Sequence, residues 1–316
     1  WWKRARAGGT VPVIQRQRLG RGPQPTAKRV TSTRQDLNYK AFTAESEMRM
    51  YRGQTVAVVV PAYNEEGLVG EVLDSIPAFV DRVYAVDDCS TDETWTEIQR
   101  YASRVESTPS TTTDSRGVES ELTSDGGRRE ASIVPIRHDT NTGRGGAVKT
   151  GYKTAIDAEM DLVAVIDGDG QMDPTILDRF LDPIVADEAA YTKGNRLDNP
   201  TQRAQMSSWR LFGNALLTGL TRIASGYWEM TDPQNGYTAI STAALQELEI
   251  DRLYDGYGFL NDMLVHLNVN DIEIKDVPTT AHYGEEESGI EYRSFVPMLT
   301  LLLISRYLWR LQLKLF

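Results

Sequence analysis

Short apolar runs that end directly in polar clusters constrain the fold of this chain more than any other feature. Residues 56–60, 83–86, 133–136 and 162–166 are apolar runs of strand length. Stretches with helical apolar spacing lie between them, so strands alternate with helices along the chain. This order predicts an α/β fold: a Rossmann-like, mostly parallel central sheet flanked by helices, with its ligand crevice at the carboxyl ends of the strands.

The fourth run leads straight into Asp-Gly-Asp-Gly-Gln at residues 167–171. Alternate residues of an extended stretch point to the same side, so we expect Asp167, Asp169 and Gln171 to converge on one point. Hard oxygen ligands on a short Gly-containing turn suit Mg²⁺ or Mn²⁺, which keep open positions for phosphate oxygens. A bare Asp-x-Asp is more often an acidic surface turn, so the interpretation as a metal–diphosphate site depends on the motifs around it.

Polar clusters follow the other runs as well. Residues 61–66 read Pro-Ala-Tyr-Asn-Glu-Glu, and residues 87–92 read Asp-Asp-Cys-Ser-Thr-Asp. In the second cluster Ser90 or Thr91 is expected to cap the next helix. Residues 141–149 are a Gly-rich start to a further helix, and the charge of Arg144 within it fits a nucleotide contact and a solvated position equally well.

In this order the motifs resemble those of inverting family 2 glycosyltransferases with the GT-A fold. Gln171 after the Asp-x-Asp is similar to the branch that contains dolichyl-phosphate mannose synthases and polyprenyl-phosphate glucosyltransferases. The resemblance spans roughly residues 54–310, and it depends on the ordered combination because each motif alone is weak. The matching segments are Pro61-Ala-Tyr-Asn-Glu65, Asp87-Asp88-x-Ser90, Asn141-x-Gly143-x-Gly145, Asp167-x-Asp169-x-Gln171, Gly194-Asn-Arg196, Arg210 with Asn214, Asp232-Pro-Gln-Asn-Gly-Tyr237 and Tyr283-Gly-Glu-Glu-Glu-Ser288.

The resemblance implies a nucleotide diphosphate sugar as donor. A metal on Asp167, Asp169 and Gln171 would stabilise the charge that develops on the leaving diphosphate. A neutral Gln171 leaves that site less negative than a third carboxylate would. A carboxylate is also suited to accept hydrogen bonds from ribose or base. The residues implied to bind the nucleotide are Pro61, Tyr63, Glu65, Val86, Asp88, Asp167 and Gly168.

On the acceptor side, Arg196 and Arg210 match positions that bind a lipid phosphate in the family. A guanidinium suits bidentate phosphate recognition. A phosphate monoester, with a second pKa of about 6, is already largely dianionic at neutral pH and needs no base. Asp232 is expected to orient the acceptor, and with Asp169 and the two arginines it completes the predicted catalytic set. The implied reaction moves one hexose onto dolichyl or another polyprenyl phosphate.

An alternative within the same family uses a saccharide hydroxyl as acceptor. A hydroxyl normally needs a general base, for which Asp232 or Asp262 would have to serve. Asn261 precedes Asp262 where many relatives carry a Glu-Asp pair, which weakens this alternative. A sugar-nucleotidyltransferase would show a Gly-rich Arg/Lys signature after the first strand, where this chain has Pro61-Ala-Tyr-Asn-Glu65 instead. A non-enzymatic scaffold built on the basic tail is disfavoured by the Asp-x-Asp-x-Gln set.

The two ends of the chain differ in character. Residues 1–40 carry ten Lys/Arg against one acid, so residues 1–50 are predicted to be a disordered basic tail, of which residues 1–47 are expected to be either native or partly an upstream extension. The predicted glycosyltransferase domain covers 51–316, with a low-complexity insertion at 104–131 to which no chemistry is assigned. Residues 290–316 predict a membrane-proximal helix, too short in its apolar part to span a bilayer and suited either to the interface or to core packing.

Two further expectations concern the loop near the C-terminus and the single cysteine. Tyr283–Ser288 resembles a loop that closes over the site in relatives, but Gly289 replaces its usual cation and His282 is the nearest substitute. One cysteine excludes an internal disulfide, and Cys89 is expected to be a small buried residue. The implied partners are the sugar nucleotide, the lipid phosphate and a membrane surface, with no nucleic acid. The expected location is the cytoplasmic face of the membrane, and the oligomeric state is left open.

Overall fold

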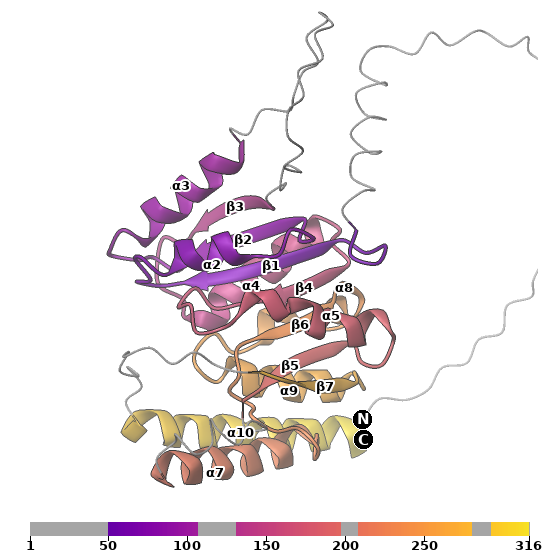
Figure 1. Cartoon of the computed structure of the whole chain (residues 1–316). Coiled ribbons are helices and arrows are strands. Elements are labelled where there is room, and N and C mark those ends of the chain that lie inside the picture. The colour runs from indigo at the N-terminus through magenta and orange to yellow at the C-terminus, as the bar shows by residue number, and fades with distance from the viewer. Residues whose placement is uncertain (1–49, 107–130, 197–207, 280–291, 316) are drawn as a thin grey trace, which may run out of the picture. The chain divides into compact units, whose positions relative to one another are not determined.

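The computed structural model describes residues 50–106, 131–196, 208–279 and 292–315, all within the unit Glu45–Phe316 (Figure 1). Several predictions concern residues outside this set: the basic tail, most of the 104–131 insertion, His282 and the Tyr283–Ser288 loop. The side chains of Arg210 and Asn214 also lie outside it. The strands of the described part form one sheet in the order β3-β2-β1-β4-β6-β5-β7. Their bounds are β1 Val56–Ala62, β2 Arg82–Asp87, β3 Ser132–Arg137, β4 Leu162–Val165, β5 Tyr191–Asn195, β6 Thr238–Ser241 and β7 Ile274–Pro278.

The sheet is mixed but mostly parallel, as predicted. β3, β2, β1 and β4 run parallel to one another, β6 runs antiparallel to both β4 and β5, and β7 is parallel to β5. Each of the four apolar runs identified in the sequence became one of the parallel strands. The carboxyl ends of β1, β2 and β4 therefore lie at one edge of the sheet, where the polar clusters follow them.

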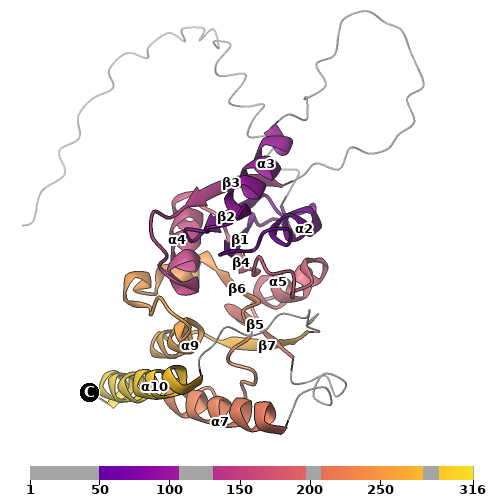
Figure 2. The ribbon, with the colours of Figure 1, turned by 90° about the vertical axis from the view of Figure 1, so that its left-hand side faces the viewer.

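Helices cover both faces of the sheet (Figures 1 and 2). The Gly-rich segment begins α4 as predicted, and the segment that contains Arg210 and Asn214 forms α7. The 3₁₀ turns are η1 Pro174–Ile176 and η2 Ile250–Arg252. The helices are α2 Val69–Ser75, α3 Thr94–Glu106, α4 Arg144–Asp157, α5 Leu177–Val185, α7 Ser208–Ser225, α8 Thr242–Gln246, α9 Phe259–Val269 and α10 Tyr292–Leu315.

Strand β1 shows how the pleat divides the core. Ala57 and Val59 belong to the cluster beneath α4 and α9, whereas Val56, Val58 and Val60 belong to the cluster beneath α2, α3 and α5. All five side chains are fully buried. Burial on both faces is typical of a central parallel strand, and each such valine contributes about 1.5–3 kcal/mol of transfer free energy.

Helices α7, α9 and α10 form a third apolar cluster, and α7 lies alongside α10 in both views (Figures 1 and 2). Leu299 and Leu303 of α10 are buried in this cluster. Leu301 and Leu308 of the same helix are exposed. The C-terminal helix thus packs on the protein with one face, as the core-packing alternative predicted, and presents leucines on the other, whose place at a membrane interface stays a prediction. In the described part of the chain no helix is both long enough and apolar enough to cross a bilayer.

Two local predictions were wrong. Helix α3 begins only at Thr94, and Asp92 rather than Ser90 or Thr91 accepts a hydrogen bond from its first backbone N–H, at 3.0 Å. Ser90 lies four residues before the helix, too far to reach the first turn, and its Oγ accepts a hydrogen bond from the backbone of Asn64 instead. Cys89 is half-buried rather than buried, with a φ of 65°.

Candidate active site

The ends of β1, β2 and β4 are bound together by backbone hydrogen bonds. The N–H of Asp88 donates to the carbonyl of Ala62 at 2.9 Å, and the N–H of Gly168 donates to the carbonyl of Pro61 at 3.1 Å. Pro61 also lies opposite Val86 in the register of β1 and β2. The structure therefore brings together the predicted nucleotide-site residues from three separate segments. Glycine fits at 168 because a Cβ there would lie 3.2 Å from the Pro61 carbonyl.

The turn after β1 carries Tyr63 and Glu65. It is centred on Asn64, whose φ of 56° lies in the left-handed region that asparagine tolerates. The side chain of Asn64 accepts a hydrogen bond from the backbone of Thr91, and the N–H of Glu65 donates to Thr94 Oγ1 at 2.8 Å. Tyr63 is exposed on this fixed turn. Asn64 was not among the predicted site residues, although its place between Tyr63 and Glu65 was a signal.

Asp88 holds the Gly-rich segment. Its Oδ1 accepts hydrogen bonds from the N–H and the hydroxyl of Thr142, both at 2.9 Å, and its Oδ2 accepts one from the N–H of Gly143 at 2.7 Å. His138 Nδ1 lies 2.7 Å from the same Oδ1, and its Nε2 contacts Thr150. A nucleotide would have to share or replace one of these bonds, so the ligand role of Asp88 stays a prediction. His138 was missed because a lone histidine after a strand carries no motif.

Arg144 pairs with the first carboxylate of the Asp-x-Asp motif. Its Nε donates to Asp167 Oδ1 at 2.8 Å, and its Nη2 lies 2.7 Å from the same oxygen and donates to the Gly236 carbonyl at 3.0 Å. Burial opposes the charged form, but Asp167 overcomes it and keeps the pKa of Arg144 raised. The buried Nη1 of Arg144 has no hydrogen-bond partner among the described residues. The structure thus excludes the solvated position for this arginine.

Residues 167–171 form a turn rather than the extended stretch that was predicted. Gly170 has a φ of 71°, and the N–H of Gln171 donates to Asp169 Oδ1 at 3.0 Å. Gly170, with its positive φ, allows this tight turn. Strand alternation therefore does not describe this segment, and the convergence of Asp167, Asp169 and Gln171 on one point stays a prediction.

The donor set of this turn fits Mg²⁺ or Mn²⁺ bound together with a substrate. Such ions are commonly held by one or two carboxylates and complete their coordination with phosphate oxygens and water. Asp167 and Asp169 supply two carboxylates, and Gln171 supplies an amide oxygen. Across the described ranges no cluster of three or more His, Cys, Asp or Glu could hold an ion by itself.

Arg196 and Asp232 form a second ion pair beyond the end of β5. Nε of Arg196 lies 2.7 Å from Asp232 Oδ2, its Nη2 lies 2.9 Å from Oδ1, and its backbone N–H donates to Oδ2 at 3.1 Å. Burial acts to raise the pKa of Asp232, but the hydrogen bonds and charge of Arg196 and the charge of Lys193 hold it below its usual value. Asp232 has a φ of 33°, so its backbone is strained.

A buried lysine fixes the turn that carries Asp232. Lys193 is 1% exposed and donates to the carbonyl of Thr231 at 2.7 Å and to Asp276 at 3.2 Å. Asp276 in turn accepts from the N–H of Thr231 at 2.8 Å. Burial lowers the pKa of Lys193, with Asp276 opposing that change. Lys193 was not predicted, because a lysine inside a strand gives no sequence signal of this role.

A small cavity of about 30 Å³ is lined by Gln171 of the Asp-x-Asp-x-Gln turn and by Arg196 of the second ion pair. It brings Gln171 and Arg196 to one space, and their roles toward donor and acceptor stay predictions. A larger open cavity of about 780 Å³ lies at the opposite edge of the sheet, near Gln54 and Asp161, and contains none of the predicted residues. The lining residues of the small cavity are Gln171, Met172, Asp173, Ile176, Arg196, Asn235, Tyr237 and Thr279.

Asp262, the alternative base, lies outside this cavity. It is fully buried on α9, where its Oδ2 accepts a hydrogen bond from the N–H of Tyr254 at 2.8 Å. Nε of Arg306 lies 2.6 Å from its Oδ1. These contacts give Asp262 a place in the packing of α9 against α10.

Comparison with known proteins agrees with this arrangement. Residues 57–249 match the model of the family described as Glycosyl transferase family 2. A UDP-N-acetylglucosamine–dolichyl-phosphate N-acetylglucosaminyltransferase of Methanococcus voltae is 28% identical over 73% of this chain and 86% of its own length. An undecaprenyl-phosphate mannosyltransferase of Micrococcus luteus is 27% identical over 74% of this chain and 85% of its own.

Solved structures show the same fold. Glucosyl-3-phosphoglycerate synthase of Mycobacterium tuberculosis, in complex with Mn²⁺, UDP and glucosyl-3-phosphoglycerate, has a TM-score of 0.52 at 18% identity and covers 90% of this chain and 86% of its own. Its complex with phosphoglyceric acid has a TM-score of 0.53 at 20% identity, over 84% of this chain and 83% of its own. Three polar segments lie at the carboxyl ends of the strands, and the family model matches more than half of the chain. The chain therefore belongs to glycosyltransferase family 2 and has the GT-A fold.

Proposed function

We propose that this glycosyltransferase moves a hexose, with inversion, from a GDP- or UDP-sugar onto dolichyl or another polyprenyl phosphate. The observation that carries the proposal is the cavity shared by Gln171 of the Asp-x-Asp-x-Gln turn and by Arg196. A donor phosphate bound near Gln171 and an acceptor phosphate bound at Arg196 would lie next to each other. The product would be a lipid-linked sugar that supplies glycan assembly or protein glycosylation.

On the donor side, each segment offers a group of suitable chemistry. Tyr63 offers an exposed ring to the base, and Glu65 and Asp88 offer carboxylates to base or ribose. Asp167, Asp169 and Gln171 would hold Mg²⁺ or Mn²⁺, which when bound neutralises the diphosphate. Nη1 of Arg144 would donate to a phosphate oxygen, because it has no partner in the described structure. The Methanococcus relative is named for a UDP-sugar, and solved relatives bind UDP with Mn²⁺ or Mg²⁺.

On the acceptor side, Arg196 would dock the lipid phosphate together with Arg210. Asp232 orients the guanidinium of Arg196 through two parallel contacts. The dianionic phosphate then attacks the anomeric carbon, and no proton has to be removed. Both relatives described above are named for a lipid phosphate, dolichyl in one and undecaprenyl in the other, which supports this acceptor class.

The geometry favours this acceptor over a saccharide hydroxyl. A general base works best with a pKa near the working pH, but Arg196 and Lys193 hold the pKa of Asp232 below its usual value. Asp262 is buried and paired with Arg306. Neither carboxylate is arranged to accept a proton from a sugar hydroxyl.

A peripheral position on the cytoplasmic face of the membrane fits the exposed side of α10. Leu301, Ile304 and Leu308 are each more than half exposed there. A helix with one packed face and one apolar exposed face can lie at the headgroup level, where a polyprenyl phosphate is presented. Ile223 and Leu216 of α7 are exposed as well.

The proposal is tested by transfer of radiolabel from a panel of GDP- and UDP-sugars into membrane lipid extract, with Mg²⁺ or Mn²⁺. We expect one donor to label a mild-acid-labile lipid, and the Asp169→Ala variant to label none. Consumption of a sugar nucleotide without labelled lipid would contradict the lipid acceptor. No consumption of any donor would contradict the proposed activity as a whole.

A further inference from the structure

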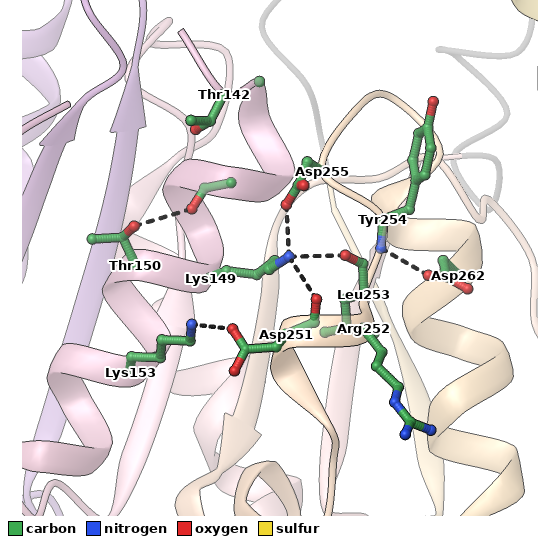
Figure 3. A network of polar contacts seen from close by, with 12 residues as sticks. Thr142, Lys149, Thr150, Lys153, Asp251, Arg252, Leu253, Tyr254, Asp255 and Asp262 are labelled. Carbon is green, nitrogen blue, oxygen red and sulfur yellow. Dashed lines mark hydrogen bonds and ion pairs between the residues drawn. The ribbon is translucent and has the colours of Figure 1, made fainter. Parts of the chain in front are cut away.

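Residues 253–258 connect η2 to α9 and lie between the first turn of α4 and the helices α9 and α10. On one side is the first turn of α4, which carries Gly143 and Arg144 of the donor site. On the other side are α9 and the C-terminal helix α10. Figure 3 shows Lys149 of α4 and Asp262 of α9 approaching this segment from opposite directions.

From the α4 side, Lys149 holds the segment with a single ammonium group. Its Nζ donates to the carbonyl of Leu253 at 2.9 Å, to that of Asp251 at 3.3 Å, and to the carboxylate of Asp255 at 2.6 Å (Figure 3). The Lys149 side chain is only 11% exposed, but the Asp255 carboxylate is 57% exposed, so solvent screens this ion pair and the bond to the Leu253 carbonyl is the better protected contact. One lysine therefore holds Leu253 and Asp255 of the segment and the neighbouring Asp251 of η2.

The same segment lies directly against the Gly-rich turn. The N–H of Gly146 donates to the carbonyl of Asp255 at 3.3 Å. A Cβ at Gly145 would meet that carbonyl oxygen at 2.5 Å and the carbonyl oxygen of Tyr254 at 2.6 Å. Because these neighbours are backbone atoms, a shift of residues 254–255 would displace the first turn of α4.

From the other side, Asp262 and Arg306 fix the segment to α10. Asp262 accepts from the N–H of Tyr254 at 2.8 Å, and Nη2 of Arg306 donates to Asp262 at 3.1 Å and to the carbonyl of Arg252 at 3.2 Å. The fully buried carboxylate of Asp262 thus bonds the segment and the C-terminal helix at once. Leu302 also packs here, since a Cβ at Gly258 would lie 2.5 Å from its Cδ2.

The first turn of α4 reaches the donor site by two bonds. The N–H of Gly143 donates to Asp88, and Arg144 pairs with Asp167. We propose that Arg306 is a positioning residue for the donor site: through Asp262 and the 253–258 segment it fixes the Gly-rich turn, and so places Arg144 beside Asp167. The role toward the nucleotide rests on the proposed function, whereas the mechanical connection does not.

Through Arg306 and Asp262, α10 also positions the 253–258 segment, in addition to exposing its apolar face. Arg306 lies on the same helix as Leu301 and Leu308. A movement of α10 against α9 would change the contacts of Asp262 and then those of Tyr254. The affinity of the chain for its nucleotide therefore depends on how α10 packs against α9.

The test compares Arg306→Met with Arg310→Met in the full-length protein. Arg310 is a matched control, because it lies four residues later on α10 but contacts Asn268 and the Ile223 carbonyl instead of this segment. Hydrogen–deuterium exchange is measured at the backbone amides of residues 143–149. We expect exchange there to be about 3- to 30-fold faster in Arg306→Met and unchanged in Arg310→Met. Equal exchange in the two variants would overturn the proposal.

A second measurement uses UDP and GDP with Mg²⁺ as probes. We expect the dissociation constant of the nucleotide that binds to rise about 3- to 30-fold in Arg306→Met and in Lys149→Met, with Arg306→Lys recovering part of the loss. The double variant should lose less than the product of the two single losses, because both residues act through one segment. Independent, multiplying losses would overturn the positioning role. Failure of wild-type protein to bind either nucleotide would contradict the proposed function, whereas the exchange result tests the connection by itself.

Discussion

Arg196 and Asp232 meet through two parallel contacts, Nε to Oδ2 at 2.7 Å and Nη2 to Oδ1 at 2.9 Å, and Arg196 lines the same cavity as Gln171. The pair joins the strand end after β5 to the turn before β6. A phosphate docked at Arg196 would meet a guanidinium whose plane is already set. Preorganised charge of this kind acts without reorganisation during the reaction.

The first prediction concerns this pair. Arg196→Met leaves the buried Asp232 carboxylate without its main partner, so we expect a loss of about 1–3 kcal/mol in the free energy of unfolding. Arg196→Lys should retain more stability, because an ammonium still pairs with Asp232. It should nevertheless lose transfer to the lipid phosphate, because an ammonium cannot make the two parallel contacts with Asp232 that orient the guanidinium. Chemical denaturation and a transfer assay on both variants measure these effects. Lipid transfer at the wild-type rate in Arg196→Met would exclude a phosphate-docking role.

The second prediction separates metal binding from stability. Asp169→Asn should weaken Mg²⁺-dependent nucleotide binding at least about tenfold, because a carboxylate ligand is lost, while the melting temperature changes little. Asp187→Asn is the control: Asp187 lies at the opposite cavity and has a φ of 54°, a conformation that asparagine also tolerates. Titration of nucleotide with and without Mg²⁺ distinguishes the two variants. Equal metal dependence in both would remove Asp169 from the metal site.

The third prediction is a pH dependence of stability at His266. This side chain is 2% exposed, beside Asp262 and Trp309, and burial lowers its pKa despite the opposing charge of Asp262. A depressed folded-state pKa contributes stability above the unfolded value of about 6.5, and that stability is lost as the pH falls through the folded-state pKa. The free energy of unfolding should therefore decline below about pH 6.5, by up to about 1.4 kcal/mol per pH unit.

Denaturation of wild type and His266→Gln between about pH 7.5 and 5 measures this effect. The variant should show a smaller slope over that interval, since the residue that takes up the proton is gone. An identical slope in the two proteins would show that other groups cause the decline.

The fourth prediction concerns the exposed face of α10. Replacing Leu301 and Leu308 by Gln should weaken binding to phospholipid vesicles about tenfold or more, because two leucines no longer enter the apolar layer. Nucleotide affinity measured without vesicles should stay unchanged, which provides an internal control. Undiminished vesicle binding in the double variant would place the membrane contact elsewhere.

The sequence predicted the fold well because buried parallel strands are local signals. Residues 56–60 and 162–166 are apolar throughout, and both segments form strands, β1 and β4, whose side chains are buried on both faces of the sheet. Gly143 and the residues after it marked the start of α4 correctly. Local spacing was less reliable where glycine allows a tight turn, so residues 167–171 were wrongly expected to be extended.

The partners of the site residues were not predictable in the same way. Asp88 pairs with His138 and the 142–143 turn, and Lys193 with Asp276, across separations along the chain that no motif records. These contacts exist only once the sheet has assembled. Arg144 illustrates the limit, since its ion pair with Asp167 excludes the solvated position, whereas its contact with a nucleotide stays a prediction.

The central claim is that the acceptor is a lipid phosphate that needs no base. It is tested most directly by comparing transfer to polyprenyl phosphate and to polyprenol of the same chain length, in the same vesicles and with the donor that wild-type protein uses. The account predicts labelled lipid with the phosphate and none with the alcohol. Equal labelling of the alcohol, or label in a water-soluble saccharide alone, would contradict it.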